Sequence, residues 1–141
     1  MLKITKHRIK RVIDNQPQFS KLLGLNILDV KENQVSAEME ITEHFTNRNG
    51  VMHGGAIMAF ADDVAGATTF INLPQGMSTT TIESKTNFFR PIKIGERITA
   101  QCDIINKGKK IFVLQTTISR SDKKIAAIII QTQIILKFNN P

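Results

Sequence analysis

The chain of 141 residues is 41% hydrophobic and 22% charged, which is typical of one soluble globular domain over residues 1–141. Its longest apolar run, Ile125 to Ile130, is far shorter than the ~20 residues of a membrane-spanning helix and suits a buried strand. A single cysteine excludes an internal disulfide and is typical of a reducing compartment, so we expect a cytoplasmic protein.

The net charge of +7 is concentrated at the N-terminus, where residues 1–14 carry five Lys and Arg residues against Asp14. This balance of +4 leaves only +3 for the other 127 residues. Basic residues are not interleaved with aromatic ones, and the chain has no Trp or Tyr to stack on bases. We therefore expect no nucleic-acid partner.

The first segment also carries apolar residues that fall near one helical stripe, namely Leu2, Ile9, Val12 and Ile13. They predict an N-terminal helical segment over 1–22, docked on the domain with its basic face in solvent. The alternative is a helix that binds a membrane surface or directs the chain to an organelle.

Alternating apolar and polar residues predict strands at 24–30 and 34–42, followed by turn-forming residues at 46–50. Residues from Gly54 to about Phe70 are apolar almost all round and rich in small side chains, which predicts a buried helix. Four further strand segments are expected at 79–89, 97–106, 111–119 and 125–137, with Cys102 as a buried structural thiol. A lone buried helix among antiparallel strands must be wrapped by the sheet, so the predicted fold class is α+β.

Two aspartates, Asp62 and Asp63, interrupt this apolar helix. An ionised carboxylate in apolar surroundings costs several kcal/mol unless it is paired or hydrogen-bonded. Adjacent helix positions differ by ~100°, so the two carboxylates cannot share one environment. One of them is expected to face a polar pocket as an acid, base or nucleophile; alternatively, both lie where the helix emerges from the sheet.

The same helix begins with His53-Gly54-Gly55. The first N–H groups of a helix lack internal partners, and glycine lets a ligand approach them closely. Such a helix start can stabilise a carbonyl oxygen that becomes negative, although an ordinary glycine-rich turn is the alternative. His53 and Asp62 lie on opposite faces and ~13 Å apart along one helix. Two antiparallel helices of a two-fold dimer would bring them to one carbonyl group.

Asn47, His53-Gly54-Gly55 and Asp62, at these spacings, resemble the motif of the hotdog-fold, PaaI-like acyl-CoA thioesterases. That group includes phenylacetyl-CoA thioesterases and one class of 4-hydroxybenzoyl-CoA thioesterases. The resemblance extends from about Leu23 to Leu136 and includes the segments at 86–91 (TNFFRP) and 94–96 (IGE). It implies a hotdog fold, with an antiparallel sheet around one long central helix, in a homodimer that pairs into a tetramer.

The resemblance also implies hydrolysis of an aryl- or medium-chain acyl-CoA to the free acid and CoA, without a metal or cofactor. Asp62 is then the nucleophile or general base, and the Gly54 N–H, beside His53, polarises the thioester carbonyl. Asn47 positions the attacking water or the carboxylate. Thr81 matches a Ser or Thr that assists in some members.

Thr80 is an alternative to Thr81, because the preceding loop is one residue longer here than in some relatives. Basic residues near the site are candidates to meet the CoA phosphates, although a basic hairpin tip is more often simply solvated. The candidate CoA-binding residues are Gly55, Arg90, Lys107, Lys109 and Lys110.

Two other functions compete with thioester hydrolysis. A hydroxyacyl-thioester dehydratase of the same fold would use a His and an acidic residue in another motif, which is not found here. A non-catalytic acyl-CoA sensor would carry an additional DNA-binding helical domain, and residues 1–22 are too short to form one. The scattered histidines and the lone cysteine lack metal-ligand spacing.

Overall fold

The structure, a computed structural model, describes residues 4–138, so Leu2 of the predicted apolar stripe lies outside the described residues. Within this range the elements are α1 (Lys6–Asp14), α2 (Gln18–Leu23), β1 (Asn26–Lys31), β2 (Gln34–Glu40), a 3-10 helix (Glu43–Phe45), α3 (Gly54–Asn72), β3 (Met77–Phe88), β4 (Arg97–Lys107), β5 (Ile111–Ser119) and β6 (Ile125–Lys137).

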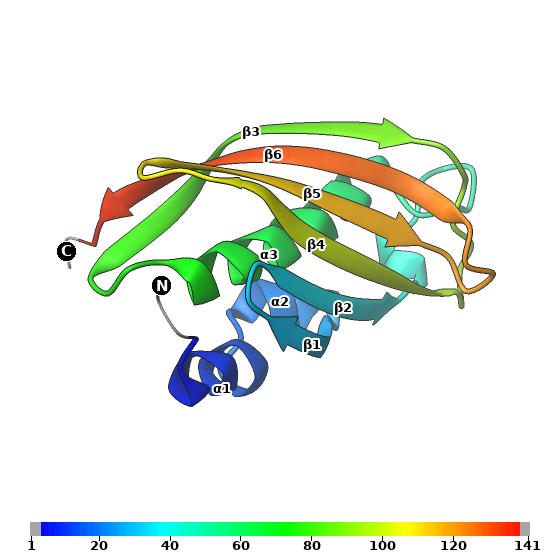
Figure 1. Cartoon of the computed structure of the whole chain (residues 1–141). Coiled ribbons are helices and arrows are strands. Elements are labelled where there is room, and N and C mark those ends of the chain that lie inside the picture. Colours follow the sequence, from blue (N-terminus) through cyan, green and yellow to red (C-terminus); the bar gives the residue numbers. More distant parts are fainter. Residues whose placement is uncertain (1–3, 139–141) are drawn as a thin grey trace.

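The six strands form one antiparallel sheet in the order β1-β2-β4-β5-β6-β3. The sheet curves around α3, which lies against its concave face (Figure 1). Each strand alternates between an inward and an outward side chain; on β5 the residues Phe112, Leu114, Thr116 and Ile118 are buried and their neighbours are not. The predicted α+β architecture, with a sheet around one long helix, is confirmed.

The N-terminal helical segment consists of two helices separated at Asn15-Gln16-Pro17. Pro17 lacks an N–H group and directly precedes α2, a position that proline tolerates. The α1 helix docks on α3 through the buried Val12 and through Arg8, whose guanidinium donates to the Leu73 carbonyl just after α3. The predicted docking is confirmed, but Arg8 and Arg11 turn toward α3 and its end, and Ile13 of the predicted apolar stripe is 46% accessible.

Strand β3 is an edge strand that pairs only with β6. Its register shifts between Thr81 and Glu83, where β3 has one more residue than β6. The extra residue changes which side chains face inward, so Thr79 and Thr81 face inward before it, and Ser84 and Thr86 after it. This bulge decides which threonine can reach α3.

Contrary to the prediction, α3 is not buried all round. The sheet covers only one side of the helix, and a stripe with the i, i+3, i+7 spacing stays exposed: Gly55, Met58 and Asp62. Apolar side chains of β3 are exposed beside it, with Ile82 56% and Phe88 53% accessible. The uncovered side of α3 and the free edge of β3 are therefore partly apolar.

No helix within residues 4–138 combines the length and the apolar character needed to cross a membrane.

Candidate active site

The Asp62 carboxylate is held on one oxygen by two donors from the sheet. Thr81 Oγ1 on β3 donates to Asp62 Oδ1 at 2.8 Å, and Gln131 Nε2 on β6 donates to the same oxygen at 2.6 Å. Asp62 Oδ2 has no hydrogen-bond partner among the described residues, and the residue as a whole is exposed. A carboxylate with one oxygen fixed and the other accessible can accept a proton from water or attack a carbonyl carbon.

Thr81, and not Thr80, contacts Asp62, because the strand places Thr79 and Thr81 inward and Thr80 outward. Gln131 was not predicted as a site residue. The sequence does hint at it: Gln131 is a polar residue at one of the alternating β6 positions that face inward, and Ala127, Ile129 and Ile135 at the same kind of position are apolar. The alternation predicts that Gln131 is buried, but only the register of β6 against β3 and the packing of α3 reveal that it contacts Asp62.

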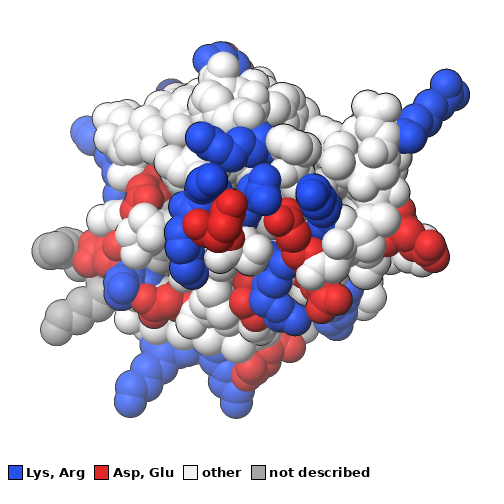
Figure 2. All heavy atoms as spheres, turned by 90° about the vertical axis from the view of Figure 1, so that its right-hand side faces the viewer, with Lys and Arg blue, Asp and Glu red and all other residues white. Residues whose placement is uncertain are grey.

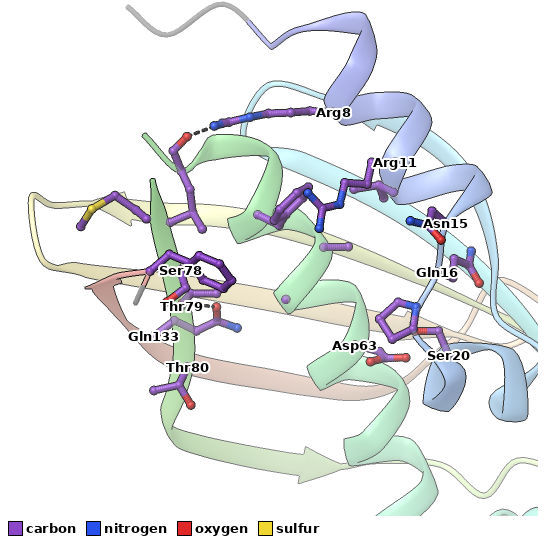
Figure 3. Close-up of a pocket in the computed structure, with 18 of the residues that line it drawn as sticks. Arg8, Arg11, Asn15, Gln16, Ser20, Asp63, Ser78, Thr79, Thr80 and Gln133 are labelled. Atoms are coloured by element: carbon purple, nitrogen blue, oxygen red, sulfur yellow. Dashed lines mark hydrogen bonds between the residues drawn. The ribbon is translucent and has the colours of Figure 1, made fainter. Parts of the chain in front are cut away.

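Asp63 points in another direction from Asp62, as their ~100° separation on the helix requires. Figure 3 shows its carboxylate beside Ser20 of α2, under the N-terminal helices. Burial raises the pKa of Asp63, while a hydrogen bond to Ser20 opposes the rise, and Oδ2 is buried without a partner. The ionised form of Asp63 is therefore destabilised by burial, and its position gives no support for a catalytic role.

A groove of about 1250 Å³ lies beside both aspartates, between α1 and the first half of β3. Arg8 and Arg11 border it on the α1 side, and Ser78, Thr79 and Thr80 on the β3 side (Figure 3). Its floor includes Gly66, Ala67 and Phe70 of α3, as part of a lining that mixes apolar and polar side chains. The groove leaves Asp62 accessible to a small molecule.

The start of α3 carries a free backbone donor. His53 is the N-cap, and its Nδ1 accepts the Gly55 N–H at 2.9 Å, while its carbonyl accepts from Ala56 and Ile57. The Gly54 N–H has no hydrogen-bond partner among the described residues. The His53 side chain thus accepts the Gly55 N–H, and the Gly54 N–H remains free to bind a ligand. This geometry fits the predicted role of Gly54 and removes Gly55 as a free donor.

Asn47 and Arg90 lie near Gly54. All three line a second cavity, of about 330 Å³, with Phe88 and Ile92. Asn47 shapes its own turn, because its Oδ1 accepts the Asn49 N–H at 2.9 Å and its N–H donates to Val51 at 2.8 Å. Its side-chain amide NH₂ has no partner in the described part of the chain and can serve a ligand.

The predicted catalytic residues therefore form two groups that a single chain does not bring together. Asp62 and Thr81 line the larger groove, whereas Asn47 and Gly54 line the smaller cavity. Asp62 follows Gly54 by eight positions on α3, which is about 12 Å along the helix axis. One thioester carbonyl cannot contact both groups within one subunit.

The candidate CoA-binding residues are separated as well. Arg90 lies at the beginning of α3, where its guanidinium donates to the Ile125 carbonyl at 2.6 Å. Lys107 lies at the opposite end of the helix, and its amine donates to Asn72 at 2.7 Å and to Asn33 at 3.2 Å. These contacts fasten the β4–β5 hairpin to α3, so Lys107 has a structural role; Lys109 and Lys110 have no such contacts.

Charges at the end of the molecule where α3 begins are mixed. Figure 2 shows basic side chains interspersed with acidic ones on this face. Arg97 pairs with Glu38 and Glu40, and Arg120 with Glu96 and Asp122. The ion pairs neutralise much of the positive charge, and no continuous basic surface of the kind that binds nucleic acid covers this end.

Cys102 lies on the inward face of β4 and is buried. Burial raises the pKa of its thiol to about 11. Such a thiol is a poor nucleophile at neutral pH, in agreement with the predicted structural role. In residues 4–138 no three His, Cys, Asp or Glu side chains are grouped to hold a metal ion.

Comparison with known proteins gives concordant matches in sequence and in structure. Residues 49–127 match the family model described as the thioesterase superfamily. A Saccharolobus solfataricus protein, provisionally named an esterase, is 29% identical over 129 residues, covering 92% of this chain and 91% of its own. Human acyl-coenzyme A thioesterase 13 is 23% identical over 114 residues, covering 80% and 79%.

The Escherichia coli PaaI protein, from the phenylacetic acid degradation operon, superposes with a TM-score of 0.83 at 20% identity, covering 95% of this chain and 96% of its own. This likeness confirms the predicted PaaI-like hotdog fold.

Proposed function

Because the chain belongs to the thioesterase superfamily, we propose that it hydrolyses acyl-CoA thioesters to a free acid and CoA, with Asp62 as the catalytic carboxylate. The prediction of a thioesterase is confirmed by the family match. The acyl-CoA substrate is supported by the name of the human relative. The observation that carries the role of Asp62 is its carboxylate, fixed on Oδ1 by two donors and free on Oδ2 beside an accessible groove.

The chemistry follows from the two groups of residues. The thioester carbonyl oxygen accepts the Gly54 N–H, whose donor strength is increased by the positive end of the α3 dipole. Asp62 removes a proton from a water molecule that attacks the carbonyl carbon, or attacks that carbon itself and forms an anhydride that water then hydrolyses. In both routes the carbon–sulfur bond breaks, and CoA leaves as a thiolate that takes up a proton. Asn47 contributes its free amide NH₂ to the water or the carboxylate.

We further propose that Gly54 and Asp62 of each site come from different subunits of a two-fold dimer. Their separation along one helix supports this arrangement, since the donor and the carboxylate must both lie within ~3 Å of one carbonyl group. The exposed stripe of α3 and the adjacent free edge of β3, with Met58, Ile82 and Phe88, provide the uncovered apolar surface for a second copy.

Two dimers would then pair into a tetramer through another surface. Exposed apolar side chains of α2 and β1, namely Phe19, Leu22 and Leu28, are 49–72% accessible. They belong to the opposite edge of the sheet from β3, because β1 and β3 are the two edge strands. The candidates to bind the CoA phosphates are Arg90, which lies near Gly54, and two lysines of the β4–β5 hairpin, Lys109 and Lys110.

The proposed activity is tested by release of free thiol from a panel of aryl-, medium- and long-chain acyl-CoAs. Asp62→Asn should lower kcat by about 10²-fold or more, the typical contribution of general base catalysis. Asp63→Asn is the matched control, because it removes the neighbouring charge from the same helix; it should retain kcat within a few-fold. Full activity of Asp62→Asn, or equal losses from both variants, would contradict the role of Asp62. Tight acyl-CoA binding without turnover would indicate a sensor instead.

A further inference from the structure

Gln131 is a buried amide that contacts the proposed catalytic carboxylate. The residue is 1% accessible, lies on the inward face of β6, and its Nε2 donates to Asp62 Oδ1 at 2.6 Å. A hydrogen bond to an ionised oxygen is shorter and stronger than one between neutral groups. Gln131 is thus in direct contact with Asp62 from a rigid strand at the interior of the sheet, between β5 and β3.

The other half of this amide is unsatisfied. Gln131 Oε1 is buried and has no hydrogen-bond partner among the described residues. A buried polar oxygen without a partner costs free energy, so an apolar side chain of the same length would suit this position better for stability alone. The only bond that the Gln131 side chain makes in the described structure is the one to Asp62.

Both donors to Asp62 use the same oxygen. Thr81 approaches Oδ1 from β3 and Gln131 approaches it from β6, so the carboxylate plane is fixed from two strands. The remaining oxygen, Oδ2, is then directed away from both donors. A reacting group held within fractions of an ångström by its supporting contacts reacts faster than one that rotates freely.

We propose that Gln131 is a positioning residue for the thioesterase reaction: together with Thr81 it fixes Asp62 through Oδ1, so that Oδ2 is the oxygen that acts on water or on the thioester. This inference rests on the proposed function of Asp62. Gln131 acts through the carboxylate and touches no substrate atom.

The strand offers a closely matched control. Gln133, two residues on, has the same inward orientation and is also 1% accessible, but it lines the groove (Figure 3), its Oε1 accepts from Thr79, and it makes no hydrogen bond to Asp62. Replacing either glutamine by methionine removes a buried amide and keeps nearly the same length and volume.

The experiment compares kcat, KM and the urea midpoint of Gln131→Met and Gln133→Met with those of the wild-type enzyme. Gln131→Met should lose about tenfold or more in kcat, the usual effect of losing a hydrogen bond to a charged group, with KM nearly unchanged. Its urea midpoint should be equal to that of the wild-type enzyme or higher. Gln133→Met alters the lining of the groove, so its KM is expected to change, but its kcat should fall by less than that of Gln131→Met because no hydrogen bond joins Gln133 to Asp62.

Three outcomes separate this proposal from alternatives. Gln131→Met with wild-type kcat, in an enzyme that Asp62→Asn inactivates, overturns the positioning role and leaves the function intact. The positioning role is also overturned if Gln131→Met and Gln133→Met lose kcat and stability to the same extent, because both glutamines would then only stabilise the fold. If Asp62→Asn itself retains activity, the proposed role of Asp62 fails, and the role of Gln131 fails with it.

Discussion

At the scale of single residues, the two adjacent aspartates differ because they face different surroundings. Asp62 is exposed and bonded to Thr81 and Gln131, whereas Asp63 is directed toward Ser20 under the N-terminal helices. Two carboxylates of identical chemistry are therefore distinguished by the elements that surround them. Only Asp62 combines an accessible oxygen with fixed orientation.

Asp63 should make the stability of the protein depend on pH. Burial raises its pKa above the ordinary value of 3.8, so the native state binds this proton more tightly than the unfolded chain. The stabilisation is complete below pH ~3.8 and is lost as the pH rises through the higher native pKa. Asp63→Asn stays neutral at every pH. Its free energy of unfolding should therefore exceed that of the wild type at pH 7.5.

Urea unfolding at several pH values from 4 to 7.5 tests this expectation. The stability difference between Asp63→Asn and wild type should shrink steadily as the pH falls toward 4. A difference that is constant across this range, or that grows on acidification, would show that the carboxyl group of Asp63 is not destabilised by burial.

Sequence patterns could predict some of the candidate site residues but not all of them. The apolar helix predicted that one of the two carboxylates faces a polar pocket, and the resemblance of the Asn47, His53-Gly54-Gly55 and Asp62 spacing to the PaaI-like motif favoured Asp62. Gln131 was missed because its importance depends on a contact 69 positions away in the chain. Periodicity predicts that residue 131 is inward, but a one-residue change in strand register would direct it elsewhere.

At the scale of elements, the start of α3 and the bulge of β3 position the proposed catalytic groups. The bulge between Thr81 and Glu83 selects Thr81 over Thr80, an ambiguity that the sequence left open. The strands themselves were predictable from alternation, because one face of each is buried. The bulge was not, since no glycine or proline marks it.

Gly54 is the first residue of α3, a position at which proline is well tolerated in helices. The preceding residue, His53, has φ −66° and ψ 137°, a conformation that a following proline also favours. Gly54→Pro should therefore fold; it lacks the free N–H and, like Gly54→Ala, adds a Cβ beside the Phe88 ring. We expect kcat to fall by about 10²-fold, as for loss of one donor to a developing oxyanion.

Gly54→Ala gives the corresponding control. It keeps the N–H and adds the same Cβ, 3.2 Å from the Phe88 ring, so it separates the effect of the Cβ from that of the lost donor. Its loss in kcat should be smaller than that of Gly54→Pro. Circular dichroism and size-exclusion chromatography verify folding; a folded Gly54→Pro enzyme with wild-type kcat would exclude the N–H from the reaction.

At the scale of the whole molecule, the proposed mechanism requires residues from two chains. The groove beside Asp62 and the cavity beside Gly54 lie along different parts of α3, and apolar residues of α3 and β3 remain uncovered. The distance between the two groups was predictable, because helix geometry is fixed. The pattern of exposure on α3 was not, since a helix rich in apolar residues all round gives no indication of which side the sheet leaves open.

The most direct test of the central claim, a site shared between two subunits, is complementation between two inactive variants. Gly54→Pro and Asp62→Asn should each be inactive alone. After they are refolded together, random mixing makes half of all dimers mixed. In a mixed dimer with shared sites, both lesions fall in one site and the other site is wild type. We therefore predict roughly a quarter of the wild-type kcat per subunit. If verified mixed dimers are no more active than either parent, each subunit must work alone, and the shared site is contradicted.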